Sequence, residues 1–375
     1  MAYILKILSP THIHSGEVIR AMNYMIKDDK VLIFDELDVI SSVKYNELLN
    51  DDLLRNFATS DSKRKEYNKT LDYYINKNIV EDSVVEKYKL VADNYVGNLS
   101  GQEIYGTMVN ILGSYIPGST IKGVIRTAII YDYLLNKGID YIKEAVNYLY
   151  SKEGSCYTID DYILYEVQEN YGINKDIQRD PFKFLGVKDM NMTQNRLGIY
   201  QETIYNIDNF IPGNVIEAIE PGDYTEEFDF EIRVNEKVSH RFNEDIIRYF
   251  EEKELLRVLY QYSKDIIQDE LEYFKQNKHP AFNSKEAIEI LEELDSINNL
   301  DKPVLRIGKG KGYKSNTIAL AIKKLDRDYY VREIKNIAIP YKYNKNYEFP
   351  KTRKFVNSAV SPKLLGFTIL EKVDR

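Results

Sequence analysis

The 375-residue sequence predicts an α+β fold, and three observations support this class. Strand-like and helix-like segments occur without the regular strand–helix alternation of a doubly wound parallel sheet. The length exceeds what one ordinary hydrophobic core requires, which predicts about two domains with insertions. The hydrophobic share of 43% and the charged share of 29% are those of a folded globular protein.

The first half of the chain reads as strands interrupted by a helical insertion. Between 35 and about 91, apolar residues recur at three- and four-residue spacing, which predicts helix. A later helix begins within IPGSTIKGVIRTAI and ends near Lys137, with Gly138 as its C-cap. The expected strands are at 2–8, 18–27, 31–34 and 103–109.

The second half combines strands, a long helical region and a mixed tail. Residues 197–207 and 215–234 alternate as strands do, and turn dipeptides join them. Residues 241–296 predict helices with an acidic outer face, which we interpret as a second insertion. The tail from 303 predicts a strand, a Gly-rich loop, a helix and final strands. We place the domain boundary between 180 and 181.

Charge is divided unevenly along the chain, although the net charge is −8. Residues 302–375 hold 18 Lys/Arg against 6 Asp/Glu, a surplus of twelve positive charges. Residues 1–301 hold 33 Lys/Arg against 53 Asp/Glu, a surplus of twenty negative charges. A basic segment on an acidic body suggests a polyanionic partner at one place, although clustered surface charge would look the same.

Several classes of protein are excluded by composition. No apolar run approaches the ~18 residues of a membrane helix, and the first residues lack the pattern of a signal peptide. The single cysteine, Cys156, excludes a disulfide framework and a thiolate-rich zinc site. We therefore expect a cytoplasmic protein without a membrane partner, a bound metal or a small-molecule cofactor.

The segment IPGSTIKGVIRTAI (116–129) is a candidate anion site. It lacks the P-loop spacing, and the companion motifs of a Ser119-x-x-Lys122 acyl-enzyme are absent. Ser119 or Thr120 as helix cap would leave first-turn N–H groups available to an anion. Lys122 and Arg126, four residues apart, would share one face. A capped helix with two solvated cations explains the segment equally well.

Two basic segments of the tail are further candidates for phosphate contact. LRIGKGKGYKSNTI (305–318) lacks the spacing of a dinucleotide site, so we interpret it as a basic loop or a mobile hairpin tip. FPKTRKF (349–355) predicts a strand that tracks phosphates or an edge protected by charge. The residues concerned are Gly308, Lys309, Gly310, Lys311, Gly312, Lys314, Lys351 and Arg353.

Two histidines follow the first strand, in SPTHIHSG. His12 and His14 point the same way if this segment is extended, which permits a shared site. They could act as general acid and base in RNA cleavage, contact RNA, ligate a metal or serve only the loop structure. No carboxylate cluster lies near them in the sequence.

The order of these motifs resembles that of the RAMP superfamily of CRISPR proteins. The resemblance rests on SPTHIHSG, IPGSTIKGVIRTAI, RDPFKFLGVKD, IGKGKGYKS and FPKTRKF…LLGFTIL, and it is strongest to the fifth subunit of type III-A (Csm) effector complexes. It implies two ferredoxin-like (RRM-like) domains with helical insertions. It also implies a non-catalytic subunit that caps the backbone at the 3′ end of the CRISPR RNA and is needed for 3′-end maturation.

The resemblance further implies partners and contacts. The partners would be CRISPR RNA, neighbouring Csm backbone subunits and recruited host nucleases. Residues 188–204 would form a thumb-like hairpin, with Met190 or Met192 as an apolar wedge between bases. The alternative is a metal-independent endoribonuclease that processes precursor CRISPR RNA with His12 or His14 as base. The remaining expected RNA contacts are Ser15, Gly16, Arg179, Lys183 and Arg196.

Overall fold

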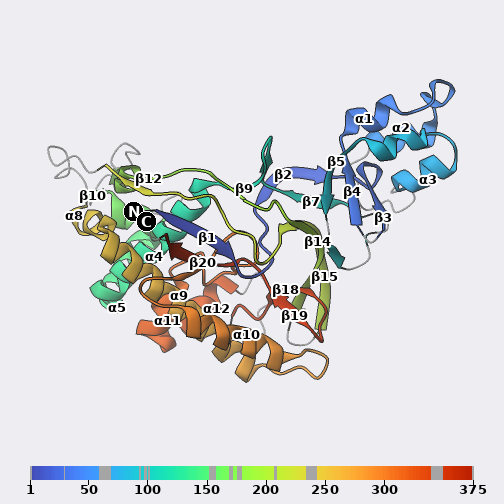
Figure 1. Cartoon of the computed structure of the whole chain (residues 1–375). Coiled ribbons are helices and arrows are strands. Elements are labelled where there is room, and N and C mark those ends of the chain that lie inside the picture. Colours follow the sequence, from blue (N-terminus) through green and yellow to red (C-terminus); the bar gives the residue numbers. More distant parts are fainter. Residues whose placement is uncertain are drawn as a thin grey trace.

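The two ends of the chain meet in one small antiparallel sheet (Figure 1). Strand β1 (Tyr3–Ile7) and strand β17 (Val304–Arg306) flank strand β20 (Phe367–Lys372). The pairing joins residues more than 360 positions apart, so neither terminal segment forms its sheet alone. The computed structural model describes residues 2–28, 30–58, 69–92, 94–96, 99, 102–151, 158–168, 172–174, 180–206, 209–233, 243–338 and 349–373.

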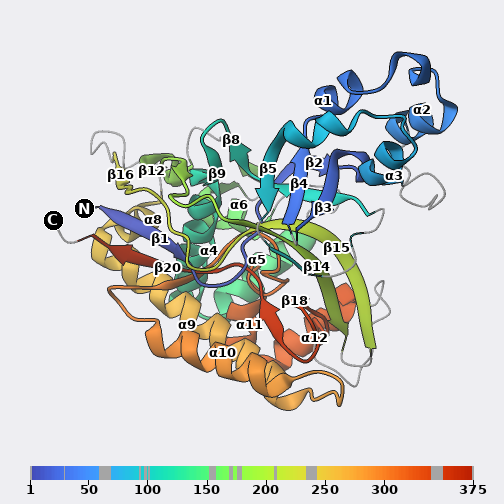
Figure 2. The same ribbon diagram turned by 45° about the vertical axis from the view of Figure 1, so that its right-hand side comes forward.

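A larger mixed sheet is built around one long hairpin. Strands β14 (Leu197–Asn206) and β15 (Asn209–Ile219) pair antiparallel, with an irregularity between Gln201 and Thr203. Figure 2 shows this hairpin as a long curved ribbon, and near its turn Tyr205 stacks on Phe274 with 6.4 Å between the ring centroids. The order is β19-β18-β14-β15-β7-β2, with β6 (Asn94–Val96) also on β14. The remaining strands are β2 (His14–Ile19), β7 (Ile104–Thr107), β18 (Arg353–Asn357) and β19 (Pro362–Leu364).

Two long helices pack against each other beside the sheets. Helix α4 (Gly118–Lys137) ends where expected, because Gly138 adopts φ 83° and its N–H bonds to the Leu134 carbonyl. Helix α9 (Glu252–Gln276) contacts it through Tyr131 and Tyr262, whose ring centroids are 5.1 Å apart. The other helices of this layer are α5 (Ile139–Ser151), α6 (Ile159–Leu164), α8 (Glu244–Ile247), α10 (Ser284–Ile297), α11 (Ala319–Leu325) and α12 (Arg327–Ala338).

The predicted helices of 241–296 are present, but they are not a peripheral insertion. On α9, Leu255, Val258 and Ile267 are fully buried in two hydrophobic clusters. A helix buried on both sides must satisfy its charged residues internally. Its acidic residues accordingly pair with the basic C-terminal segment, as detailed below.

A small lobe projects from the rest of the molecule (Figure 1). It has its own antiparallel sheet of β3 (Tyr24–Lys27), β4 (Lys30–Phe34) and β5 (Tyr88–Ala92). Short helices α1 (Glu36–Ser41), α2 (Asp51–Ala58) and α3 (Leu71–Asn76) cover it and share a separate core around Phe34, Leu71 and Tyr74. Within the described residues, the segment predicted as a helical insertion at 35–91 contains these three short helices and also strand β5.

The thumb-like hairpin expected at 188–204 is wrong. Strand β13 (Met190–Asn191) pairs with β9 (Gly113–Ile116) rather than with β14. The long hairpin comprises β14 and β15 instead. The α+β class is confirmed. Strands from the two sides of the expected 180/181 boundary pair with each other, and that boundary remains a prediction. The other strands are β8 (Val109–Asn110), β10 (Glu166–Gln168), β11 (Gly172–Asn174), β12 (Leu185–Val187) and β16 (Phe230–Ile232).

No helix within the described ranges is long and apolar enough to cross a membrane.

Candidate nucleic-acid interface

The Gly-rich loop of 308–312 lies directly on the segment that carries the two histidines. The Lys309 N–H donates to the His12 carbonyl over 2.9 Å. Gly308, Gly310 and Gly312 adopt φ 63°, 94° and 80°, a region that favours glycine. A Cβ on Gly308 would stand 2.3 Å from the His12 oxygen. Close packing within the protein thus accounts for Gly308, without a ligand.

Four side chains gather around a buried carboxylate beside this loop, and we call them the junction cluster: His14, Tyr105, Lys309 and Lys354. The His14 and Tyr105 ring centroids are 5.5 Å apart, and the Lys309 ammonium is 5.3 Å from the Tyr105 ring centroid. These residues come from β2, β7, the Gly-rich loop and β18. An aromatic ring among cations is an arrangement that binds single-stranded nucleic acid.

The buried carboxylate is Glu202 of β14, whose side chain is 1% exposed. Lys309 Nζ is 2.9 Å from one of its oxygens, and Lys354 Nζ is 4.0 Å from the other. One negative charge thus faces two positive charges, which leaves a surplus of one cation. Both lysines retain partly exposed side chains (21% and 39%), so they can also meet a phosphate.

Lys311, in the same loop, is half-buried and makes no ion pair with any residue that the structure describes. Burial, and then the positive charge of Arg306, lower the pKa of its ammonium. A cation that lacks a counter-ion in its own protein gains most from an external anion. Lys311 is therefore the strongest candidate for a phosphate contact among the lysines of the Gly-rich loop.

The start of α4 is closed to external anions. The Gly118 N–H donates to Asp189 Oδ1 over 2.8 Å, so a carboxylate of the protein already uses this helix end. A Cβ on Gly118 would lie 2.0 Å from the Val187 carbonyl oxygen. Ser119 and Thr120 lie inside the helix and Pro117 is its N-cap, so the expected capping role of these hydroxyls is wrong.

Lys122 and Arg126 share a helix but have different surroundings. Arg126 is 3.2 Å from Asp160 and 2.7 Å from Asp180, and its guanidinium lies 4.9 Å from the Phe182 ring centroid. These partners occupy the guanidinium and tie α4 to the segment at 180–184. Lys122 has no ion pair within the described part of the chain and remains half-exposed. Lys122, rather than Arg126, is suited to contact phosphate.

Two other expected phosphate contacts are buried. Arg353 is 7% exposed, lies 2.8 Å from Glu270 and stacks 3.8 Å from the Tyr273 ring centroid. Lys314 is also 7% exposed and reaches both Asp269 oxygens at 2.9 and 3.0 Å. The expectation that Lys314 and Arg353 contact RNA is wrong in this structure, because α9 holds both of them.

The two methionines expected as a wedge are part of the core. Met190 is 0% and Met192 3% exposed, so neither can insert between bases. Ser15 donates to the Gly106 carbonyl, and Gly16 adopts φ 91° at the surface. The remaining expected contacts are exposed Lys183 and Arg196, half-buried Lys351, and Arg179, which lies outside the described residues.

The two histidines differ in accessibility. His12 is 0% exposed, and its Nδ1 lies 2.6 Å from the Glu217 carbonyl oxygen. Burial lowers the pKa of His12 to about 4, so the ring is neutral at pH 7. A buried ring cannot take a proton from bound RNA, and the role of His12 as base is therefore wrong. His14 is exposed and its ring centroid is 5.7 Å from that of His12.

Two members of this site carried no usable signal in the sequence, whereas Lys354 lies within the basic segment FPKTRKF. Tyr105 and Glu202 stand in ordinary strands, and only pairing across the sheet brings them to the Gly-rich loop. Lys354 follows Arg353 on β18, and successive strand residues face opposite ways. That alternation could have indicated that one of the two basic residues faces the core. Across the described residues, no group of three or more His, Cys, Asp or Glu could hold a metal ion.

Comparison with known proteins gives consistent results. The profile of the RAMP superfamily matches residues 4–374. The CRISPR system Cms protein Csm5 of Methanocaldococcus jannaschii is 25% identical over 387 residues, which cover 95% of this chain and 86% of the relative. The resemblance inferred from the motifs is thereby confirmed.

Two solved structures share the fold. A chain of the type III-A Csm-crRNA-target RNA ternary complex has a TM-score of 0.70 at 21% identity, over 99% of this chain and 100% of that chain. The crystal structure of T. onnurineus Csm5 has a TM-score of 0.66 at 19% identity, over 98% and 99%.

Proposed function

Because this chain belongs to the RAMP superfamily, we propose that it is the CRISPR-RNA-binding structural subunit of a type III-A Csm complex. The observation that carries the proposal is the fold shared, over almost the whole of both chains, with a component of a Csm-crRNA-target RNA complex. In this proposal the subunit works in the cytoplasm, caps the backbone at the 3′ end of the CRISPR RNA and supports 3′-end maturation by recruited nucleases.

The junction cluster supplies the proposed RNA contact. Tyr105 offers a face on which a base stacks, a contact worth roughly 1–3 kcal/mol per base. Lys309 places positive charge beside that ring, Lys354 lies near the same carboxylate, and Lys311 adds a cation in the same Gly-rich loop. Lys122 and Arg196 add accessible cations elsewhere on the molecule. These contacts read the backbone and the faces of the bases, which fits a subunit that holds a guide of any sequence.

The test is to purify the tagged chain with its associated subunits and to sequence the 3′ ends of the bound RNA. We expect guide RNA of mature length with the unaltered protein, and longer or less abundant guides with Tyr105→Ala and Lys311→Ala together. Unchanged guide length and yield in that variant would contradict the assigned contact. Absence of guide RNA from the unaltered complex would contradict the function itself.

A cleavage assay separates this function from an endoribonuclease. The accessible histidine of the site, His14, is the residue to replace. Incubation of the purified chain with repeat RNA in EDTA is expected to leave the RNA intact. Cleavage that disappears in His14→Ala would establish the enzyme instead.

A further inference from the structure

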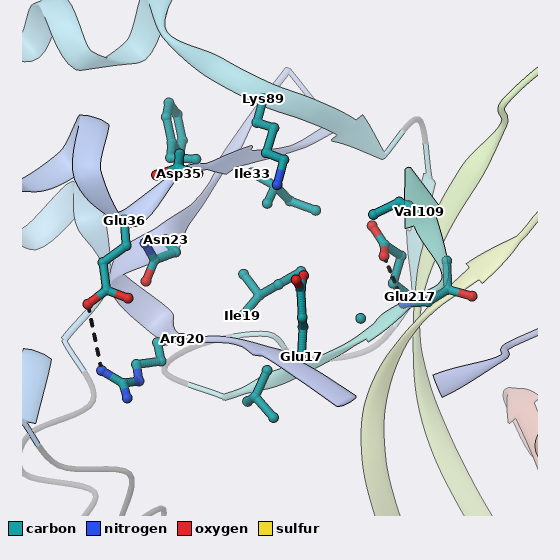
Figure 3. A pocket seen from close by; sticks show the side chains of 14 residues that line it. Glu17, Ile19, Arg20, Asn23, Ile33, Asp35, Glu36, Lys89, Val109 and Glu217 are labelled. Atoms are coloured by element: carbon teal, nitrogen blue, oxygen red, sulfur yellow. Dashed lines mark hydrogen bonds and ion pairs between the residues drawn. The ribbon is translucent and has the colours of Figure 1, made fainter. Parts of the chain in front are cut away.

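A cavity of about 310 Å³ lies between the projecting lobe and the edge of the large sheet, on strands β2 and β7, which also carry His14 and Tyr105. Strand β2 forms one wall, and β4 and β5 form the other (Figure 3). Strand β2 is the last strand of the large sheet, so among the described strands of that sheet its outer edge has no partner. The cavity has no part in the RNA contacts proposed above.

The cavity contains a carboxyl group whose second oxygen has no partner. Glu217 is 1% exposed, and its Oε2 accepts the Thr107 N–H over 3.0 Å. Its Oε1 is buried and receives no hydrogen bond. A buried acceptor left in this state costs free energy. A ligand that brings a hydrogen-bond donor would therefore recover this energy.

The charged groups that line the cavity favour a cationic ligand. Of the four carboxyl groups in the lining, Glu36 is paired with Arg20 at 4.0 Å, and burial raises the pKa of Glu217 to about 7. The carboxylates of Glu17 and Asp35 then face one remaining cation, Lys89. Figure 3 shows the polar ends of Glu17, Lys89 and Glu217 turned toward the same space. A nucleotide would bring its phosphate against this surplus of carboxylates, which disfavours RNA here.

The walls suit a long apolar stem. Ile19, Ile33 and Val109 line the cavity between its charged groups. An arginine side chain has a hydrocarbon stem for such walls and five N–H donors with no acceptor at its end. It therefore matches both the aliphatic walls and the carboxyl acceptors.

We propose that this cavity receives an arginine side chain from a neighbouring protein subunit, with Glu217 Oε1 and the Glu17 carboxylate as its hydrogen-bond acceptors. The ammonium of Lys89 holds the place of the cation in the free chain and is displaced when the guanidinium enters. The neighbour's identity rests on the proposed function, but the recognition of arginine does not.

The test uses N-acetyl-arginine methylamide as the probe and saturation-transfer NMR on the full chain. We expect saturation of the arginine methylene protons, and at least about tenfold less for the citrulline analogue, which has the same shape but no charge. The loss corresponds to one or two charge-assisted hydrogen bonds. Equal signals from the two probes would overturn the proposal, as would a signal from guanosine monophosphate in place of arginine.

Variants assign the signal to the cavity. Glu17→Gln with Glu217→Gln should abolish it, whereas Glu289→Gln, an exposed acid on α10, should leave it unchanged. Lys89→Met should strengthen it by removing the competing cation. Circular dichroism and thermal melts confirm that each variant is folded. A signal that survives in the folded double variant would overturn the proposal.

A second measurement separates this inference from the proposed function. The full chain and the Glu17→Gln, Glu217→Gln variant are each co-expressed with the other subunits of the complex. We expect the variant to lose a protein neighbour at least about tenfold more readily than the unaltered chain in a salt wash. Equal retention would overturn the arginine's assignment to a subunit. If the unaltered chain assembles with no subunit but binds the arginine probe, the proposed function fails and the cavity's specificity stands.

Discussion

At the scale of single residues, burial determines what each polar side chain can do. His12, which ionises to a cation, and Glu217, which ionises to an anion, both illustrate this. The pKa of His12 falls to about 4 and that of Glu217 rises to about 7, in each case chiefly because burial opposes the charged form. Burial therefore favours the neutral form of both groups. The two residues are also in contact, because the His12 ring is hydrogen-bonded to the Glu217 backbone carbonyl.

These two groups predict opposing effects of pH on stability. In the folded state Glu217 holds its proton more tightly than in the unfolded state, so the free energy of unfolding falls as pH rises from 4.5 to 7, by about 3 kcal/mol in total. His12 resists protonation when folded, so the same quantity falls by about 3 kcal/mol as pH drops from 6.5 to 4. Between 4.5 and 6.5 the two contributions nearly cancel.

Glu217→Gln should remove the contribution of Glu217 and leave the pH dependence of stability that His12 causes. We expect the free energy of unfolding of this variant to decrease on acidification from pH 6.5 to 4.5, whereas that of the unaltered chain stays nearly level. Urea unfolding at four pH values across this window measures both. Glu289→Gln, which removes an exposed acid, should keep the level profile. A level profile in Glu217→Gln would refute the assignment.

Lys122 and Arg126 provide a matched pair on one helix. Arg126→Met removes the partner of Asp160 and Asp180 and should lower the free energy of unfolding by about 1–2 kcal/mol, since the pair is partly exposed. Lys122→Met should change stability by less than about 0.5 kcal/mol and weaken RNA binding several-fold.

Denaturant titration and filter binding on both variants separate the two roles. If Arg126→Met kept its stability but lost RNA binding, the roles assigned to Lys122 and Arg126 would be wrong.

At the scale of elements, helix α9 neutralises the basic C-terminal segment. Asp269 lies 2.9 Å from Lys314 and 2.7 Å from Lys323, and Glu270 lies 2.8 Å from Arg353. The nearby lysines lower the pKa of Asp269 despite its burial. The charge division found in the sequence therefore reflects, in large part, pairing between two segments of the same chain.

Asp269→Asn tests this pairing. The change removes the carboxylate shared by Lys314 and Lys323, which are 8% and 10% exposed, while Lys323 keeps Glu272 at 2.8 Å. We expect the free energy of unfolding to fall by about 3–5 kcal/mol, because removing one partner of a buried ion pair is costly. Glu289→Gln on α10, where the acid is 60% exposed, should cost less than about 0.5 kcal/mol. Thermal melts of both variants decide, and equal melting temperatures would exclude the pairing as a source of stability.

The sequence predicted where helices lie better than it predicted which residues pack against them. The end of α4 followed from Gly138, whose left-handed φ a helix terminus commonly requires. The helices of 241–296 followed from apolar spacing. Their burial did not, because acids that face a basic neighbour and acids that face water have the same spacing. The same ambiguity made Lys314 and Arg353 look like phosphate contacts.

At the scale of the whole molecule, the sheets join segments that are distant in the sequence. Strand β1 pairs with β20, and β7 pairs with β15 from the other half of the chain. Local periodicity contains no information on such partners, so neither the large sheet nor the junction cluster could be predicted from it. The order of short motifs did indicate the superfamily, because that order is a property of the chain as a whole.

The salt dependence of RNA binding provides a test of the whole molecule. If all 18 basic residues of 302–375 faced RNA, the affinity would fall very steeply with salt. The structure buries or pairs many of them and leaves three well-placed cations in this segment, Lys309, Lys311 and Lys354, to which Lys122 of α4 adds a fourth. Each phosphate contact to single-stranded RNA contributes about −0.7 to the slope of log affinity against log salt.

We therefore expect a slope near −3 for the isolated chain, measured by fluorescence anisotropy between 50 and 300 mM salt. Lys311→Ala should reduce the magnitude of the slope by about 0.7. The control variant Lys363→Ala, on β19, should leave the slope unchanged. A slope steeper than about −8 would mean that the internal ion pairs open to RNA.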